Sequence, residues 1–550
     1  MIGVLADKTN PGVIDEFFEL FKTPWQFHDD NLDSDVLICA GTPPANTSAK
    51  LVIIYAVEPS MVDRERACEP LSNYAGAILS YREQPVPIYG KCLTFRHAKT
   101  DLLLHEATSE PAACQIVSAN QTIVWIGYDL FAEVRCLLKH GQPITNAAVP
   151  TLELHIAILR DLIVRSSISL VEIPPVPSAS QFIVCLTHDI DQPGIRQHGF
   201  DRTTLGFLYR ALIGSCIHFC KGRRSLKFVG QNWLAAFSLP FVHLGLARDF
   251  WSRFDRYLEI ENNVPSTFFI IAKKGNPGRS LEGRISNARA AKYGLGDIRE
   301  QIQCLRASSS EIGLHGIDAW SDANDGRSEL DAIRATGTQS DGVRMHWLFF
   351  TEDSPTKLEE AGFGYDSTVG YNETIGYRAG TTQVFKPMDV NRLSELPLHI
   401  MDTALFLPSR MNISFKKAKT MVHALLADFD RFGGALTVNW HDRSIAPERL
   451  WGDFYADFLK ACENRGVWFA TASQCVAWFR KRRSVTFQTV TGANGRTQIR
   501  VSTPPTSDNL PGLRLRVHQS QTEFRDTAFD DSVEVELPPI RDRQLAFGDS

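Results

Sequence analysis

The stretch Val184-Cys185-Leu186-Thr187-His188-Asp189-Ile190-Asp191 is an apolar run that ends in two aspartates separated by one residue. Side chains alternate along a strand, so Asp189 and Asp191 can point to one side while His188 and Ile190 point to the other. Two carboxylates this close repel each other unless a cation or a shared proton lies between them. The stretch therefore predicts a strand that ends in a metal site or an acid/base pair. On this stretch alone, the alternative that both aspartates only cap a turn stays open.

Three further strand-like runs end in side chains that can carry chemistry. The run Glu311–Gly316 contains His315, the run Val343-Arg344-Met345-His346 ends in a histidine, and Thr437–Asp442 contains His441. A lone histidine at a strand end is more often a packing or surface residue. Four strand ends that together carry Asp, His and Arg are hard to explain as packing, and they favour one shared site.

Short apolar strands alternate with helical patterns between Gln181 and Arg483, over a length suited to a (β/α) barrel. Such barrels place their active sites at the C-terminal ends of the strands, where the four groups above lie. The expected strands are Phe182–Leu186, Ser266–Ile271, Glu311–Leu314, Gly342–Met345, Ala435–Trp440 and Val467–Ala470.

The remaining chain predicts two smaller units. Residues 1–172 alternate short strands with helices and indicate a small α/β domain, with strands expected at 35–40, 51–57 and 122–127. The proline-rich stretch 173–178 bars regular structure and opens a barrel domain at 173–484. Residues 485–550 alternate Thr, Val and Arg between turn signals, which is typical of a small β-rich appendage followed by a frayed tail.

Composition limits the class of protein. The chain has 550 residues and a net charge of −5 with both signs interspersed, which argues against a surface for nucleic acid or an anionic membrane over the whole molecule. Its first residues lack the pattern of a secretory signal, and its most apolar later stretch, Phe207–Cys220, is too short to span a membrane. The eleven cysteines have no CxxC spacing and are expected to be free thiols in the cytoplasm. The sequence does not set the oligomeric state.

In these motifs the sequence resembles the polysaccharide deacetylases, carbohydrate esterase family 4, which have the NodB-homology fold. The resemblance covers roughly Gln181 to Phe479 and is closest to a subgroup associated with exopolysaccharide genes, in which an uncharacterised domain precedes the catalytic one. The motifs that carry it are Thr187–Asp191, Pro265–Phe269, Glu311–His315, Gly342–His346, Tyr365–Thr368, Gly376–Gly380, Glu395–Pro397 and Trp440-His441.

The resemblance implies hydrolysis of an acetyl group, N-acetyl more often than O-acetyl, from a sugar polymer in a distorted (β/α) barrel. It implies a divalent metal, usually zinc, with Asp191 and His315 as ligands. Asp189 matches the general base and His441 the general acid. Arg344 matches the residue that orients the base.

Asp366 is a weaker match, to a residue that steers the acid histidine. Two features depart from the commonest family pattern: Ile190 separates the two aspartates, and Ala319 stands where a second histidine ligand is usual. Because catalytic zinc sites typically carry three protein ligands, another donor is needed. Of two candidates, Asp318 and His346, we expect His346, since the strand ends of one barrel face converge.

Two alternatives to a deacetylase remain. The chain could be a non-catalytic glycan-binding or assembly protein with a degenerate barrel, or a related barrel hydrolase that acts on a different C–N bond, such as that of a small cyclic amide. Both Asp189 and His441 are present, which favours catalysis because a binding module needs neither. The sugar is not fixed by any motif and depends on loops such as Asp201–Gln231.

Overall fold

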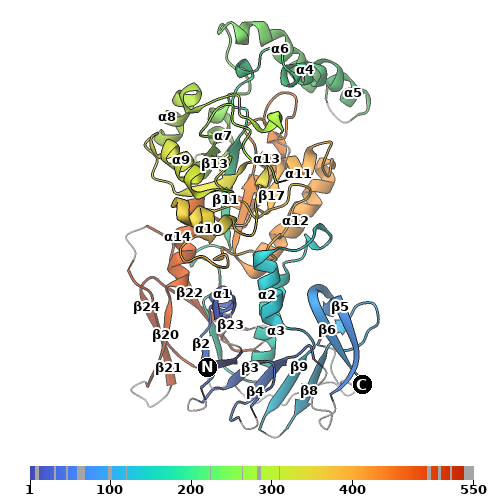
Figure 1. Cartoon of the computed structure of the whole chain (residues 1–550), viewed down its shortest axis with the longest axis vertical. Helices are drawn as coiled ribbons and strands as arrows, with labels where there is room; N and C mark the ends of the chain where they lie inside the picture. The colour runs from blue at the N-terminus through green and yellow to red at the C-terminus, as the bar shows by residue number, and fades with distance from the viewer. Residues whose placement is uncertain are drawn as a thin grey trace.

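Figure 1 shows the computed structural model, with the N-terminal sheet at one end, the central sheet in the middle and a group of helices at the other end. The structure describes the whole chain except residues 7–10, 30–32, 45–46, 59–67, 97–101, 119, 223–224, 263, 282–285, 309, 492–496, 506–508, 521–522 and 538–550. Within the described residues, no helix combines the length and the apolar character that crossing a membrane requires.

The N-terminal part is built on a six-stranded sheet, as expected for a small α/β domain. Its order is β2-β1-β3-β4-β9-β8, and every pair is parallel except β8 with β9. The strands are β1 (Ile2–Leu5), β2 (Trp25–Phe27), β3 (Val36–Ala40), β4 (Leu51–Tyr55), β8 (Ala113–Val117) and β9 (Thr122–Ile126). The helices are α1 (Pro11–Phe21), α2 (Leu130–Lys139) and α3 (Thr151–Arg165). The predicted strands at 35–40, 51–57 and 122–127 are thereby confirmed as β3, β4 and β9.

A long hairpin of β5 (Glu69–Tyr81) and β6 (Gln84–Arg96), extended by β7 (Leu104–His105), lies beside this sheet. A disulfide joins Cys68, just before β5, to Cys114 on β8. The expectation that all cysteines are free thiols was therefore wrong for this pair. The two residues are 46 apart in sequence, and no spacing motif marks such a pair.

The central part is a curled, parallel sheet of half-barrel form, which confirms the predicted fold class. Its order is β16-β15-β14-β13-β12-β11-β18-β17, with β19 also paired to β11. The strands are β11 (Ile183–Ile190), β12 (Ser266–Ile270), β13 (Glu311–Gly316), β14 (Gly342–Met345), β15 (Tyr365–Asp366), β16 (Ser394–Glu395), β17 (Ile400–Met401), β18 (Ala435–Asn439) and β19 (Trp468–Phe469). All six predicted barrel strands occur, and three two-residue strands, β15 to β17, add to them.

Helices cover this sheet because their apolar faces bury against its strands. They are α7 (Phe254–Ile260), α8 (Arg299–Ala307), α9 (Ala323–Arg334), α10 (Ser354–Ala361), α11 (Asp402–Phe406), α12 (Phe415–Phe432), α13 (Gly452–Glu463) and α14 (Ala472–Arg483). Short 3₁₀ turns are η3 (Ile144–Asn146), η4 (Ile195–Gln197), η6 (Asn287–Arg289), η7 (Leu295–Ile298) and η8 (His346–Leu348).

A helical insertion follows β11 and stands apart at the top of Figure 1. It consists of α4 (Arg202–Leu208), the π-helical turn η5 (Tyr209–Gly214), α5 (Ser215–Cys220) and α6 (Leu226–His243). The segment Asp201–Gln231 was expected to consist of loops, and it is largely helical instead.

The C-terminal part forms antiparallel strands, as its alternating pattern predicts. One sheet has the order β20-β21-β24, and β22 and β23 form a second sheet with β10 (Leu170–Glu172). The strands are β20 (Thr486–Thr491), β21 (Thr497–Ser502), β22 (Leu513–His518), β23 (Phe524–Phe529) and β24 (Ser532–Glu536).

Glu172 on β10 is the centre of a buried ion-pair network between these parts. It accepts hydrogen bonds from Arg160 of α3 at 2.8 Å and from His518 of β22 at 2.9 Å. Burial alone would raise the pKa of Glu172, but the two basic partners outweigh it and hold this pKa well below its usual value. The carboxylate therefore stays charged and joins the N-terminal part to the C-terminal strands.

The stretch Pro174–Pro177 has no regular structure, as its prolines predict, and it is buried rather than exposed. The basic run at the end of α14 lies against it. Arg482 donates to the carbonyl oxygen of Ile173 and to two carbonyls of the last turn of α1, each at 2.9 Å. The basic run Arg480-Lys481-Arg482-Arg483 at the end of α14 thus links the barrel to the N-terminal part.

Candidate active site

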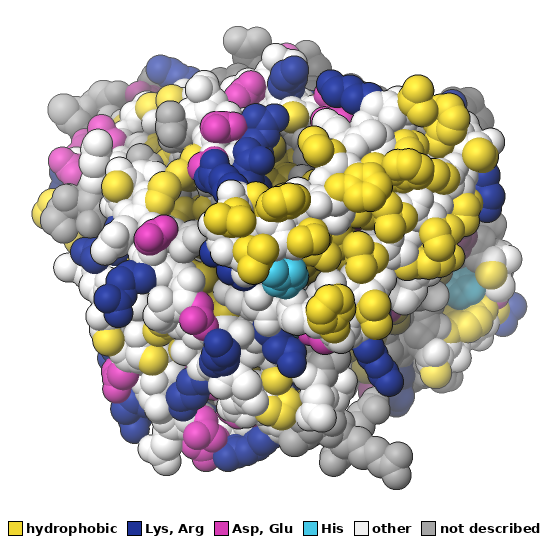
Figure 2. Space-filling model, turned by 90° about the horizontal axis from the view of Figure 1, so that it is seen from above, with side chains coloured by type: hydrophobic (Ala, Val, Ile, Leu, Met, Phe, Trp, Pro, Cys, Tyr) yellow, Lys and Arg dark blue, Asp and Glu magenta, His cyan; other side chains and the backbone are white. Residues whose placement is uncertain are grey.

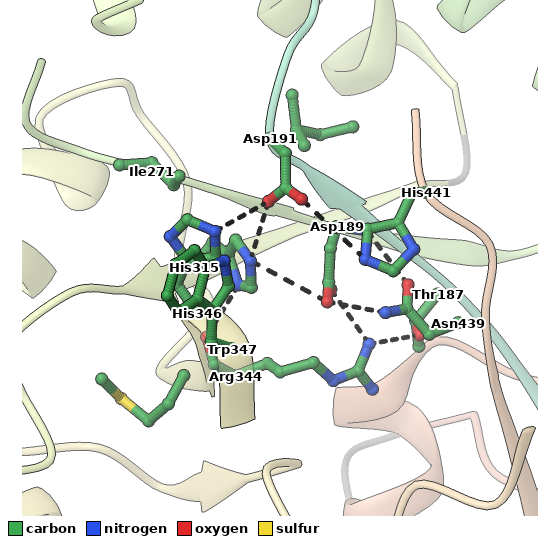
Figure 3. Close-up of polar contacts among 12 residues, drawn as sticks. Thr187, Asp189, Asp191, Ile271, His315, Arg344, His346, Trp347, Asn439 and His441 are labelled. Carbon is green, nitrogen blue, oxygen red and sulfur yellow. Dashed lines mark hydrogen bonds and ion pairs between the residues drawn. The ribbon is translucent and has the colours of Figure 1, made fainter. Parts of the chain in front are cut away.

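Asp189 and Asp191 lie at the C-terminal end of β11 and point to the same side of the sheet (Figure 3). His188 points to the other side, where its Nε2 lies 2.7 Å from the Glu261 carboxylate and its Nδ1 lies 2.8 Å from the carbonyl oxygen of Trp440. The alternation that the sequence predicts is therefore present. It separates a buried structural histidine from two carboxylates that face the other site residues.

Asp189 is buried and held from both of its oxygens. Arg344 donates to Oδ1 at 3.1 Å, and the amide of Asn439 donates to Oδ2 at 2.6 Å. Burial alone would raise the pKa of Asp189, but nearby basic groups, His315 and Arg344 foremost, outweigh it and lower the pKa. Asp189 is thus an ionised carboxylate in a fixed orientation, which is what a proton acceptor needs.

Arg344 on β14 takes its position from the loop after β15. Its Nε and Nη2 donate to the carbonyl and hydroxyl oxygens of Ser367, at 2.9 and 2.8 Å. Its Nη1 also donates to Thr187 at 2.6 Å, and the guanidinium lies 4.6 Å from the centre of the Phe269 ring. The side chain is therefore rigid and presents its charge to Asp189.

Asp191, His315 and His346 form a group whose donor atoms all lie within 4.8 Å of one another. Oδ1 of Asp191 lies 3.2 Å from Nε2 of His315 and 3.5 Å from Nε2 of His346. Ligands at about 2.0–2.1 Å from a tetrahedral zinc ion lie about 3.3–3.4 Å apart. One carboxylate and two imidazoles at these distances fit a divalent ion such as zinc.

The hydrogen bonds and charges of the two histidines suit this role. Nδ1 of His315 donates to the carbonyl oxygen of Arg344 at 2.9 Å, which leaves Nε2 with its lone pair toward Asp191 when the ring is neutral. Burial lowers the pKa of His346 to about 3, so this imidazole is neutral and able to bind a metal. Burial would also lower the pKa of His315, but Asp189 and Asp191 outweigh it and raise that pKa.

The structure distinguishes the two candidates for the third donor. His346 follows β14 directly and faces Asp191, whereas Asp318 accepts hydrogen bonds from the backbone of Arg279 at 2.6 Å and from Asn276 at 3.1 Å. Ala319, where a second histidine is usual in the family, packs into the hydrophobic core. The geometry therefore brings His346, and not Asp318, to the group.

His441 lies after β18, on the other side of Asp191, with 3.9 Å between its Nε2 and Oδ2 of Asp191 (Figure 3). Its Nδ1 lies 2.6 Å from Oδ1 of the fully buried Asp402, and its backbone N–H donates to Oδ2 of the same residue at 2.8 Å. Burial would lower the pKa of His441, but Asp402 outweighs it and raises this pKa to about 10. The imidazole is therefore a cation with a fixed orientation.

Asp402 takes the place that the sequence reasoning gave to Asp366. Asp366 is buried and accepts a hydrogen bond from Thr368, and burial raises its pKa to about 7. Its partner Thr368 belongs to the loop that positions Arg344. Asp366 makes no hydrogen bond to His441. Little in the sequence marks Asp402, because the strand before it, β17, has only two residues.

A cavity of about 380 Å³ is lined by Asp189, Asp191, His315, His346 and His441. Trp347, directly after His346, lies at this cavity with 41% of its surface exposed and a φ of 65°. Non-glycine residues adopt this left-handed conformation rarely, and such residues cluster at functional sites. Asn372 holds the turn by donating to the Trp347 carbonyl at 2.9 Å.

No known protein-family model matches the sequence, and no curated protein matches it. Among solved structures, the chain is similar to a protein named as a polysaccharide deacetylase from Mycobacterium smegmatis, with 20% identity, 56% of this chain and 95% of that chain covered, and a TM-score of 0.34. A second such protein, from Pseudomonas aeruginosa PAO1, has 18% identity, coverage of 58% and 98%, and a TM-score of 0.35. An allantoinase has 17% identity, coverage of 56% and 92%, and a TM-score of 0.33.

The further resemblance of residues 1–172 to the domain found in the exopolysaccharide-associated subgroup stays a prediction. Over about 56% of its length, the chain is similar to solved proteins that bear the name polysaccharide deacetylase.

Proposed function

We propose that the protein is a metal-dependent hydrolase that removes acetyl groups from a sugar polymer or its precursor. The observation that carries this proposal is the convergence of Asp189, the group of Asp191 with two histidines, and His441 on one cavity. A proton acceptor and a proton donor on either side of a site fitted for a divalent ion are what acetyl hydrolysis requires.

Asp191, His315 and His346 would hold the metal, for which we propose zinc. A divalent ion there would polarise the acetyl carbonyl and lower the pKa of a water molecule. The buried Arg344 carbonyl keeps the His315 ring in the orientation that ligation needs.

Asp189 would accept the proton of the attacking water. Its low pKa keeps it ionised near neutral pH, and Arg344 and Asn439 fix both of its oxygens. Each carboxylate oxygen accepts one hydrogen bond from these two residues and keeps a second lone pair free. The carboxylate can therefore take up a proton without rotating.

His441 would give a proton to the leaving group, with Asp402 holding its ring. A raised pKa means that the ring is charged before the reaction begins, so a proton is ready when the C–N bond breaks. An amine leaves poorly without protonation, whereas an alcohol depends on it less. We therefore propose N-acetyl rather than O-acetyl groups as the substrate.

The exposed ring of Trp347 supports a sugar as the carrier of the acetyl group. Pyranose rings have apolar C–H faces that pack on aromatic side chains, and this indole lies at the cavity next to a metal-site histidine. Trp347→Ala is expected to raise KM for an oligosaccharide with little change in kcat, because it removes binding that is equal in the ground and transition states.

The test is release of acetate from a panel of N-acetylated and O-acetylated oligosaccharides, with and without a chelator. The expected result is metal-dependent release from an N-acetylated sugar. Binding of the oligosaccharides without any release would favour a glycan-binding protein instead, and release from a small cyclic amide alone would favour the other barrel hydrolases.

The predicted cytoplasmic location stays a prediction. The disulfide between Cys68 and Cys114 weighs against it, because disulfides are rare in cytosolic proteins.

A further inference from the structure

The helical insertion after β11 exposes a large apolar surface that the active site does not use. Along α4, η5 and α5 the exposed residues Leu205, Tyr209, Ile213 and Ile217 follow one another at intervals of four and form a stripe on one helix face. Seen from above, Figure 2 shows hydrophobic side chains gathered over this end of the molecule, with lysine and arginine at the edges. Soluble proteins rarely leave so continuous an apolar patch without a binding role.

Helix α6 is apolar on both its buried and its exposed face. Its outward residues include Trp233, Leu234, Phe237 and Phe241, all exposed. Its buried face is apolar too, with Leu239 and Val242, except for Asn232, which donates to the carbonyl oxygens of Phe228 and Pro447. A helix with one face in water is polar on that face, so the outer face of α6 is suited to an apolar environment.

The charges of the insertion have one sign. Between Asp201 and Asp249 every charged residue is an arginine or a lysine, among them Lys221 and Lys227 beside the ends of α5 and α6. The whole chain is acidic, with a net charge of −5, so this basic segment is a local feature. An apolar helix surface with basic residues only is complementary to a bilayer that contains anionic lipids.

The insertion is tied to the loop that follows His441. Asn232 of α6 contacts that loop at Pro447, and Arg443 lies 3.8 Å from the centre of the Trp251 ring just beyond the insertion. Arg443 also donates to Gln192 next to Asp191, at 2.8 Å. A surface that binds the insertion would therefore lie on the side of the barrel where the strands end in the active site.

We propose that the insertion Arg202–Arg248 docks on the surface of a membrane that contains anionic lipids, with its outer helix faces in the interfacial layer. It would lie on the membrane, with the exposed apolar residues of α4 to α6 at the interfacial layer, and none of the described helices is long and apolar enough to cross a bilayer. If the proposed function holds, docking places the active site near glycans that are attached to lipid, and these become the favoured substrate class.

The test measures binding of the full-length protein to vesicles, with no sugar present. One set contains phosphatidylcholine alone, and the other contains about 30 mol% phosphatidylglycerol as the anionic lipid. We expect co-sedimentation with the anionic vesicles that weakens as salt is added, and at least about tenfold weaker binding by the variant Phe237→Ser/Phe241→Ser. Lys221→Glu/Lys227→Glu, which keeps the apolar surface, should also bind more weakly, and it serves if the first variant does not fold.

The matched control is Leu71→Ser/Ile78→Ser, which removes two exposed apolar side chains from β5 in the N-terminal part. These residues are 40% and 39% exposed, against 65% and 55% for Phe237 and Phe241. The control is expected to bind vesicles as the unaltered protein does.

Two outcomes would overturn the proposal: no binding to either set of vesicles, or binding that both insertion variants leave unchanged. Sedimentation showing that the protein forms dimers through this surface, with no vesicle binding, would assign it to a second copy of the chain instead. Acetate release from a soluble oligosaccharide is measured in parallel, and Phe237→Ser/Phe241→Ser, which lies outside Asp201–Gln231, should keep it. Vesicle binding without acetate release would contradict only the proposed function, and release without vesicle binding would contradict only the membrane surface.

Discussion

Replacement of Asp189 by asparagine separates its chemical role from its structural one. Asparagine keeps the size of the side chain but loses the charge, and we expect turnover to fall by about 10²–10⁴-fold, the usual contribution of a general base. Acetate release from the best N-acetylated substrate measures the loss. A decrease of less than about tenfold would refute the assignment of Asp189 as the base.

The same change has a cost in stability that follows from the contacts. Both carboxylate oxygens accept hydrogen bonds, one from Arg344 and one from Asn439, so the new amide NH₂ must face a donor in either orientation. One buried N–H donor, of Arg344 or of Asn439, then faces the new NH₂ group and lacks an acceptor. This costs about 1–3 kcal/mol of unfolding free energy. Thermal or denaturant unfolding of the purified variant measures this quantity.

A swap variant provides the control. In Asp189→Asn/Asn439→Asp the amide of residue 189 can donate to a carboxylate at residue 439, so the hydrogen bond between them is restored. We expect stability to recover by about 1 kcal/mol or more while turnover stays low, because the carboxylate is displaced from its position. Recovery of turnover together with stability would mean that the loss in the single variant came from the damaged fold, and it would refute the reasoning.

Three further predictions concern the metal, the acid and the junction between the parts. Elemental analysis should find less metal in His346→Ala than in Asp318→Ala, since only the first removes a donor that faces Asp191; equal metal in both would reject His346 as a ligand. Asp402→Asn should lower kcat by roughly 10–100-fold with a smaller change in KM, because it frees and partly discharges the His441 ring; an unchanged kcat would show that this contact is dispensable. The folded-state pKa of Glu172 lies below its usual value of 4.5, so its stabilisation is present above about pH 4.5 and is lost as the pH falls further. Glu172→Gln should therefore unfold more easily at neutral pH and lose less stability on acidification than the unaltered protein. An equal loss of unfolding free energy in the two proteins between neutral and acidic pH would contradict this.

The sequence predicts the longer strands of the barrel because each is a buried apolar run bounded by polar residues. The motif residues follow from those strands, since parallel strands bring their C-terminal ends to one side. The strands β15, β16 and β17 have only two residues each, too few for any periodicity to be visible. Asp402 was missed for this reason, because it follows β17, whose pairing with β18 is what brings it beside His441.

Two other features lie outside what the sequence pattern can give. The Cys68–Cys114 pairing depends on how the hairpin folds back along the first sheet, which is a matter of tertiary geometry. The segment Asp201–Gln231 was expected to consist of loops because no motif covers it, whereas most of it is helical. The periodic signal of a helix fades when the environment outside the helix is itself suited to apolar side chains.

The pairing of β10 with β22 has a consequence for how the chain is synthesised. Glu172 and His518 are 346 residues apart, so a ribosome that adds roughly 5–20 residues per second needs about 17–70 s between the two. During that time the barrel is being made, while β10 presents an open strand edge and Glu172 lacks its partner His518. An open edge of this kind invites pairing with other chains. The nascent protein is therefore expected to depend on chaperones until its last strands emerge, and C-terminal truncation at residue 484 should prolong that dependence indefinitely.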